Sequence, residues 1–123
     1  MSDEQTTLVY KSAVEFVEKY LSSIYRSDIA VCAWCPEWWK HAEAVARFDA
    51  LWRTWEHYRI DGPTGLSVWL IDHAGPHMNV LLSPVGSFSG CSVRKGHSDK
   101  IPSLPLKSPS PHPFLPPTHS MDE

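Results

Sequence analysis

The sequence lacks most of the features that would assign a function directly. Basic residues are not in excess, since 11 Lys and Arg stand against 14 Asp and Glu for a net charge of -3. This balance gives no general support for binding to nucleic acid or acidic membranes, although it is compatible with a local basic patch. No run approaches the roughly 18 apolar residues of a membrane span, and the acidic start does not resemble a secretory signal. We therefore expect a cytoplasmic protein with reduced thiols.

Catalytic motifs are also missing. The chain contains no glycine-rich phosphate loop and no serine-elbow motif. Residues 73–77 (H-A-G-P-H) have the outer spacing of H-E-x-x-H, but the glutamate is absent and Gly-Pro interrupts the helix that this motif needs. Cys32 and Cys35 form a C-x-x-C, yet the surrounding chain shows little alternation of strands and helices of the thioredoxin type. We predict that the protein is not an enzyme.

Tryptophan, in contrast, is abundant, and five of the six lie between positions 34 and 55. These rings can anchor a small core, and 123 residues with 42% hydrophobic content suit one domain. A central helix is predicted over about 37–59, with Pro36 before its first turn. Its apolar residues repeat at helical spacing: Ala44, Phe48, Leu51, Trp55 and Tyr58. Two i,i+4 ion pairs, Glu43–Arg47 and Asp49–Arg53, are expected on its polar side.

Two further helical regions flank the central one. Residues 6–25 carry a stripe at spacings of four and three residues, formed by Tyr10, Val14, Val17, Leu21 and Ile24. The turn cluster at 61–65 ends the central helix, and a shorter helix is expected from about Ser67. Gly75-Pro76 should break or kink it, leaving a last apolar turn over 77–82. The predicted fold is all-α, a small bundle of three main helices plus a short fourth.

The C-terminal composition differs from the rest, because seven of the eleven prolines lie in residues 102–117. Repeated proline opposes helices and sheets, which predicts a disordered or locally polyproline II tail. Residues 102–105 and 113–116 match P-x-x-P, but this match is common by chance in proline-rich sequence. The expected organisation is a flexible N-terminus (1–5), one helical domain (6–98) and a disordered Pro/Ser-rich tail (99–123).

Cysteine and histidine offer a candidate metal site. Three cysteines cannot all pair within one chain, and the Cys and His side chains could instead bind zinc and hold together segments that a small core cannot fix alone. The candidates are Cys35, His41, His73, His77, Cys91 and His97. The favoured set is Cys35, His41, His77 and Cys91, with His73 and His97 as alternates. In the competing interpretation the cysteines are small buried hydrophobic residues and the histidines are ordinary polar groups.

The tryptophans at the start of the central helix are a second candidate site. Trp34, Trp38 and Trp39 could form an interaction surface, because exposed tryptophan is typical of interface hot spots. Two adjacent residues of one helix cannot both face the core, so either Trp38 or Trp39 should be more exposed. Trp52, Trp55 and Trp69 fit the packing stripes instead.

Several strings together resemble a known family. They are W-C-P-x-W-W-x-H from Trp34, E-A-V-A-R-F-x-A-L-W-R-x-W-E from Glu43, G-L-S-V-W from Gly65, D-H at 72–73, P-H-M at 76–78 and G-S-F before Cys91. Over about residues 34–97 the chain resembles a small actinobacterial domain family of unknown function that is also found on mobile elements. Ser87 departs from the G-P-F of that family, and Ala42 stands where proline is common. The resemblance implies membership and no known activity.

The leading functional prediction is a non-enzymatic interaction or accessory module of an actinobacterium or its mobile elements, binding an unidentified protein through Trp34, Trp38 and Trp39. The alternative is a zinc-stabilised nucleic-acid-binding domain that uses basic residues of the central region. Those residues are Lys40, Arg47, Arg53 and Arg59. Their interleaving with Glu43, Asp49 and Glu56 argues against the alternative.

Overall fold

The computed structural model describes residues 7–25 and 30–109, and these residues form helices and loops without a strand. One isolated antiparallel bridge joins Ser92 and Gly96. The all-α prediction is confirmed, but the helix count is wrong: only α4 and α5 of the described α-helices reach eight residues. The N-terminus (1–5), the second P-x-x-P motif and the tail beyond residue 109 lie outside the described residues.

The first helical region is shorter than expected, and only part of its predicted stripe is buried. It consists of α2 (Ala13–Phe16), the π-helical turn η1 (Val17–Leu21) and α3 (Ser22–Ile24). It begins at residue 13 because Ser12 Oγ accepts a hydrogen bond from the Glu15 N–H at 3.1 Å and so caps the helix. Val17 and Leu21 of the predicted stripe are buried, as is Phe16, whereas Val14 and Ile24 of the stripe are exposed. The wider π-turn displaces Ile24, which follows it, from the regular spacing.

Helix α4 (Ala42–Tyr58) is the longest element, and its inward stripe is as predicted. Ala44, Phe48, Leu51 and Trp55 are buried. The expected ion pairs are present, with Arg47 Nε 2.9 Å from Glu43 and Arg53 Nε 2.8 Å from Asp49. The helix begins five residues later than predicted, because Trp38–Lys40 form a separate 3₁₀ turn, η2, and His41 is extended with φ -108° and ψ 115°.

After the 3₁₀ turn η3 (Arg59–Asp61), Gly62 reverses the chain with φ +67°, a conformation that glycine adopts readily. α5 (Gly62–Trp69), the π-helical turn η4 (Leu70–Ala74) and α6 (Gly75–Leu81) then run on without a gap. The predicted start at Ser67 is wrong. Of the predicted break or kink at Gly75-Pro76, the break does not occur, because the helical run continues through both residues. Pro76 is tolerated because it stands in the first turn of α6, directly after the π-helical turn, where Gly75 N–H bonds to Leu70 O.

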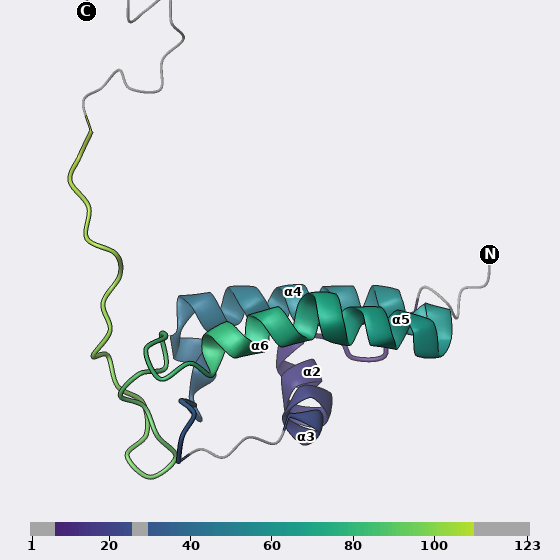
Figure 1. The fold of residues 1–123 in the computed structure, drawn as a ribbon, viewed down its shortest axis with the longest axis horizontal. Helices are drawn as coiled ribbons and strands as arrows, with labels where there is room; N and C mark the ends of the chain where they lie inside the picture. The colour runs from purple at the N-terminus through teal and green to yellow at the C-terminus, as the bar shows by residue number, and fades with distance from the viewer. Residues whose placement is uncertain (1–6, 26–29, 110–123) are drawn as a thin grey trace, which may run out of the picture.

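These elements form two layers (Figure 1). α4 lies antiparallel to the α5–α6 run, and α2–α3 crosses one face of this pair. An aromatic cluster fills the space between the layers and consists of Tyr10, Phe16, Tyr20, Trp55 and Trp69. A second group of rings lies near the start of α4, where Phe48 and Phe88 pack on Trp34. Both groups belong to one continuous core.

At the end of the molecule where α4 begins and α6 finishes, the chain forms loops over residues 30–41 and 83–100. We call this part the ligand end. It is joined to α6 by the backbone hydrogen bond from Ala33 N to Leu82 O at 3.0 Å. Beyond it, residues 101–109 are exposed and form neither helix nor strand. No helix of the described ranges has the length and apolar character needed to cross a membrane.

Candidate metal centre

Two turns of equal length meet at the ligand end, and each begins with cysteine and ends with histidine. The first runs from Cys35 to His41, and the second from Cys91 to His97. In the first, Lys40 N and His41 N bond to Glu37 O and Trp38 O, both at 3.0 Å. These bonds fold the chain back, so that His41 returns towards Cys35. A continuous α-helix would turn by about 600° over six residues and direct the two side chains to different faces.

The second turn is closed by its own backbone. Ser92 N bonds to Gly96 O at 3.1 Å and Gly96 N to Ser92 O at 2.7 Å. Ser92 Oγ also accepts a bond from Lys95 N at 2.8 Å. Gly96 has φ +83°, where a side chain would be strained. The turn therefore returns His97 to the side of Cys91.

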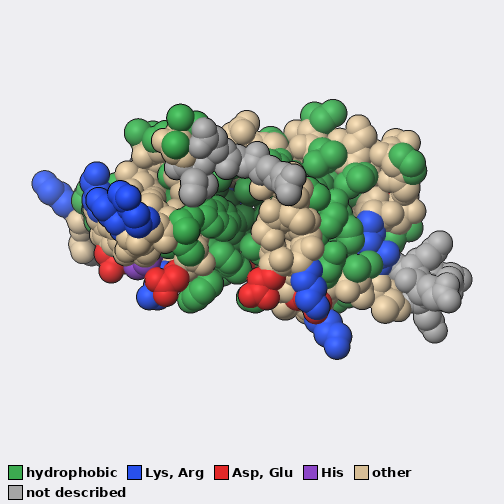
Figure 2. All heavy atoms as spheres, turned by 90° about the horizontal axis from the view of Figure 1, so that it is seen from below, with side chains coloured by type: hydrophobic (Ala, Val, Ile, Leu, Met, Phe, Trp, Pro, Cys, Tyr) green, Lys and Arg blue, Asp and Glu red, His purple; other side chains and the backbone are tan. Residues whose placement is uncertain are grey.

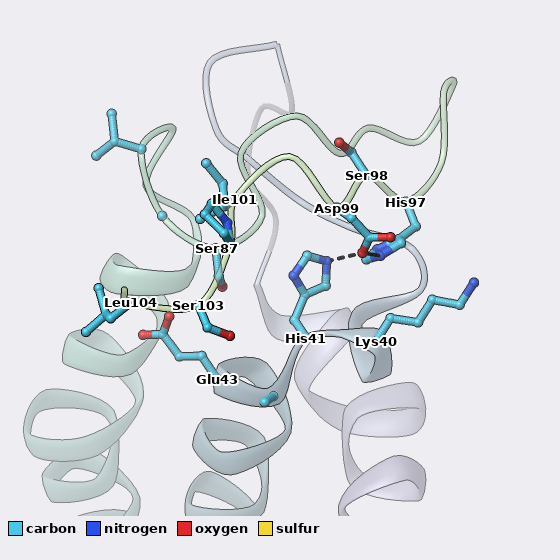
Figure 3. A pocket seen from close by; sticks show the side chains of 14 residues that line it. Lys40, His41, Glu43, Ser87, His97, Ser98, Asp99, Ile101, Ser103 and Leu104 are labelled. Atoms are coloured by element: carbon cyan, nitrogen blue, oxygen red, sulfur yellow. Dashed lines mark hydrogen bonds and ion pairs between the residues drawn. The ribbon is translucent and has the colours of Figure 1, made fainter. Parts of the chain in front are cut away.

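The four side chains converge. The donor atoms of Cys35, His41, Cys91 and His97 all lie within 4.8 Å of one another. Cys91 Sγ is 3.4 Å from His41 Nε2, and Cys35 Sγ is 3.5 Å from His97 Nδ1. Cys91 Sγ is 4.0 Å from His97 Nδ1, and the two imidazole nitrogens are 3.1 Å apart. Figure 3 shows His41 at the start of α4 facing His97 of the loop.

These separations are close to those of a tetrahedral metal site. With Zn–S of about 2.3 Å and Zn–N of about 2.05 Å, tetrahedral geometry places S and N ligands about 3.6 Å apart and two N ligands about 3.3 Å apart. The S···N distances of 3.4, 3.5 and 4.0 Å and the N···N distance of 3.1 Å scatter around these values. The residues present thus fit a four-coordinate ion, with all donor atoms within 4.8 Å of one another.

Further polar groups hold the four side chains in place. His97 Nε2 lies 2.7 Å from Asp99 Oδ1, on the opposite side of the ring from the cluster. Ser98 N donates to Cys91 Sγ at 3.2 Å. The His41 ring has a hydrogen bond with the backbone of Ser87, and Cys35 has one with the backbone of Glu37. Contacts of this kind orient metal ligands and fix the tautomer of ligating histidines.

Burial makes the cluster unfavourable for uncompensated charge. Cys35 is fully buried, and its desolvation, together with the neighbouring Cys91, raises the pKa of its thiol to about 11. Desolvation and the nearby His97 lower the pKa of His41. The neutral imidazole is the form that binds metals, whereas each thiol must lose its proton to do so. A dication among the four groups would offset the charge of the two thiolates.

The structure brings together three of the four residues in the favoured sequence set. His97, an alternate in that set, takes the fourth position, and His77 is not part of the cluster. His77 Nδ1 instead lies 2.8 Å from Arg47 Nη1, because the helix continues through Pro76 and turns this side chain towards α4. His73, the other alternate, packs on the Tyr58 ring at 5.2 Å. The identical C-x₅-H spacings of the two turns are the sequence signal that would have identified His97.

Cys32 is a free, half-buried thiol outside the cluster. Its C-x-x-C partner Cys35 faces the other ligands instead, and the raised pKa of Cys35 is the opposite of what an exchange-active thiol needs. The arrangement therefore does not favour thiol–disulfide chemistry at this motif.

The three tryptophans of the predicted interaction surface differ in exposure. Trp38 is buried and Trp34 is half-buried against Phe48 and Phe88, whereas Trp39 is 54% exposed. The prediction that only one of Trp38 and Trp39 faces the core is confirmed.

The fold and this cluster define a small helical domain with a Cys2His2 constellation. The chain belongs to the family described as Domain of unknown function (DUF4913), whose model matches residues 10–111 and so includes all four cluster residues. Comparison with curated proteins and with solved structures found no match.

Proposed function

We propose that this protein is a non-enzymatic binding module in which one structural Zn²⁺ holds the ligand end against the helices. Cys35 and His41 of the first turn and Cys91 and His97 of the second are the ligands. The observation that carries the proposal is the convergence of these four donor atoms within 4.8 Å.

The donor set favours zinc over other ions. Two thiolates and two imidazoles are soft and borderline ligands, and their tetrahedral arrangement is typical of structural zinc. Calcium and magnesium prefer oxygen ligands in larger coordination shells. Four protein ligands leave no open position for water or substrate, which supports a structural role. Free thiol ligands also fit the reducing cytoplasm predicted from the sequence.

The fold provides a reason for such an ion. Residues 83–100 contain no helix or strand that would secure them, and they are attached to the helices mainly through Phe88 and the buried Cys91. A small domain has limited apolar area for holding loops of this kind. Zinc would join the segment before α4 to the segment after α6, which lie far apart in the sequence.

We propose that the module binds another protein. Exposed Trp39 supports the predicted aromatic interaction surface. Trp39 supplies most of this surface, because Trp38 is buried and Trp34 is half-buried. The basic residues that would contact phosphates in the nucleic-acid alternative are all engaged in ion pairs. They are Lys40 with Glu37, Arg47 with Glu43, Arg53 with Asp49 and Arg59 with Glu56. An actinobacterial or mobile-element source stays a prediction of the sequence resemblance.

Cobalt titration tests the site directly, because Co²⁺ in a tetrahedral thiolate site gives strong visible absorption. Metal-free protein should bind one Co²⁺ per chain and release it when Zn²⁺ is added. Cys35→Ser and His97→Ala should abolish the tetrahedral bands. Cys32→Ser and His77→Ala are the matched controls and should leave them unchanged. Bands that survive His97→Ala but disappear in His77→Ala would instead support the set favoured by the sequence.

A further inference from the structure

Most described basic residues of the helical body and the first turn are neutralised by neighbouring carboxylates. Five pairs do this, formed by Lys19, Lys40, Arg47, Arg53 and Arg59, whereas the Lys11 side chain takes part in no ion pair of the described ranges. Residues 84–109 differ, because they contain Arg94, Lys95, Lys100 and Lys107 and only one acidic residue, Asp99. Asp99 is bonded to His97, and none of these four cations takes part in an ion pair in the described ranges.

The net charge of -3 therefore conceals a positive segment at the ligand end. Arg94, Lys95 and Lys100 are exposed, and Figure 2 shows Lys and Arg side chains gathered at this end of the molecule. Zinc does not cancel this charge, since a dication with two thiolates and two neutral imidazoles sums to zero. The surface therefore remains positive whether or not the metal is bound. The metal would hold the two turns that carry this surface in a fixed arrangement.

An exposed aromatic ring accompanies these cations. Trp39 lies in the turn between Cys35 and His41, and its ring is held edge-to-face against buried Trp38 at 5.9 Å. Arg94 and Lys95 lie in the turn between Cys91 and His97. Both turns end on side chains whose donor atoms are within 4.8 Å of one another. The indole and the two cations are thus presented by two turns anchored at the same centre.

We propose that these two turns bind single-stranded nucleic acid, with Arg94, Lys95 and Lys100 contacting phosphates and Trp39 stacking on a base. Unpaired cations together with an exposed, immobilised aromatic ring are the combination by which proteins hold single strands without reading sequence. This inference rests on the proposed function, because the metal sets the two turns against each other. Its cations are distinct from the paired Lys40, Arg47, Arg53 and Arg59.

The test is fluorescence anisotropy with a labelled oligothymidylate of about 12 nucleotides and zinc-loaded protein. Three phosphate contacts predict a slope of log K against log salt of about -2, since single strands give about -0.7 per contact. Arg94→Gln/Lys95→Gln should weaken binding at low salt and bring the slope to about -0.7. Trp39→Ala should weaken binding about 5- to 100-fold with an unchanged slope, because it removes stacking and no charge.

The matched control is Lys19→Gln/Arg53→Gln, which removes the same charge from paired positions on the helices and should change affinity less than about twofold. Equal weakening in this control would overturn the inference, because only net charge would then matter. The inference would also be overturned if zinc-loaded protein did not bind the oligonucleotide, or if it bound only vesicles containing phosphatidylserine. Either result would leave the proposal of a structural zinc standing. Protein that takes up no zinc would overturn the proposed function and this inference with it.

Discussion

At the scale of single residues, Asp99 is the polar group that fixes the orientation and tautomer of a candidate metal ligand, His97. Its side chain is 93% exposed, yet its Oδ1 lies 2.7 Å from His97 Nε2. An exposed carboxylate has no need of this partner for its own solvation. By accepting the Nε2–H, it leaves the lone pair of Nδ1 directed at Cys35, His41 and Cys91, which is the tautomer that a metal requires.

Asp99→Asn should therefore lower zinc affinity by about 10- to 100-fold while leaving the helices intact. The amide can still contact the ring but no longer stabilises the correct tautomer. Competition against a chromophoric chelator measures the affinity, and circular dichroism monitors the helices. Asp49→Asn, which alters only an exposed ion pair with Arg53, is the control and should retain wild-type affinity. Equal affinities in both variants would contradict the role assigned to Asp99.

Residue type and position together predict Cys35, His41 and Cys91 as ligands, because they flank the start of the central helix and lie in the loop that follows the last helical turn. The fourth ligand cannot be chosen in the same way, since the seven histidines of the sequence include several alternatives. The sequence favours His77 because it would tie that loop to both helices, and the structure instead turns His77 towards Arg47. Which histidine completes the site depends on backbone direction after α6, and only the equal spacing of the two C-x₅-H turns carries that information in the sequence.

At the scale of the elements, Glu56 joins the chain before α2 to the C-terminal half of α4. This carboxylate is 6% exposed and accepts hydrogen bonds from Val9 N at 3.0 Å and Tyr10 N at 2.8 Å. Arg59 Nε, one helical turn further on, donates to it at 2.9 Å. The Trp52 indole N–H donates to Tyr10 O at 3.1 Å. The same short segment is thus bound from two neighbouring positions of one helix.

Glu56→Ala should reduce the free energy of unfolding by about 3 kcal/mol, because two backbone N–H groups and a partly buried guanidinium lose their acceptor. The amides of Val9 and Tyr10 should exchange with solvent faster than in the wild type. Chemical denaturation and hydrogen exchange measure the two effects. Glu18→Ala, at an exposed position of the first helical region, should cost less than about 0.5 kcal/mol. Unchanged exchange at Val9 and Tyr10 would show that Glu56 does not hold this segment.

The elements also show where sequence periodicity succeeds. α4 follows a regular spacing over seventeen residues, so its buried stripe could be read from the sequence. The other helical regions contain the π-turns η1 and η4, which add a residue to the local turn and displace later side chains. A stripe with a fixed period could not anticipate this shift at Ile24, which follows η1. Val14 precedes η1, and its exposure shows that the predicted stripe also lies one residue away from Phe16, the buried residue of α2.

At the scale of the whole molecule, the structure has two differently stabilised ends. The aromatic cluster packs rings from α2, η1, α4 and α5 and from the segment before α2, and it includes fully buried Phe16 and Trp69. The ligand end has no regular secondary structure of its own apart from η2. Its first loop is attached to the core by Trp34 and Trp38, whereas its second loop has Phe88 and Cys91. The attachment of the second loop to the helices should therefore depend most on the metal, whereas the aromatic cluster should not.

Chelation of zinc should raise amide exchange over residues 30–41 and 83–100 by about tenfold or more, since loops with few buried contacts open locally. Exchange within α4 near Leu51 and Trp55 should change far less. Hydrogen exchange with mass spectrometry resolves these segments with and without chelator. A uniform increase along the chain would show that the metal controls global folding, and no increase anywhere would show that the loops hold without it.

The most direct measurement is the metal content of untagged protein purified without added metal, by elemental mass spectrometry together with thiol counting. The account predicts about one zinc per chain, with Cys35 and Cys91 protected from thiol reagents until a chelator is added and Cys32 reactive throughout. Protein that contains no metal, and whose three thiols react independently of chelator, would contradict the structural zinc on which the proposed function rests.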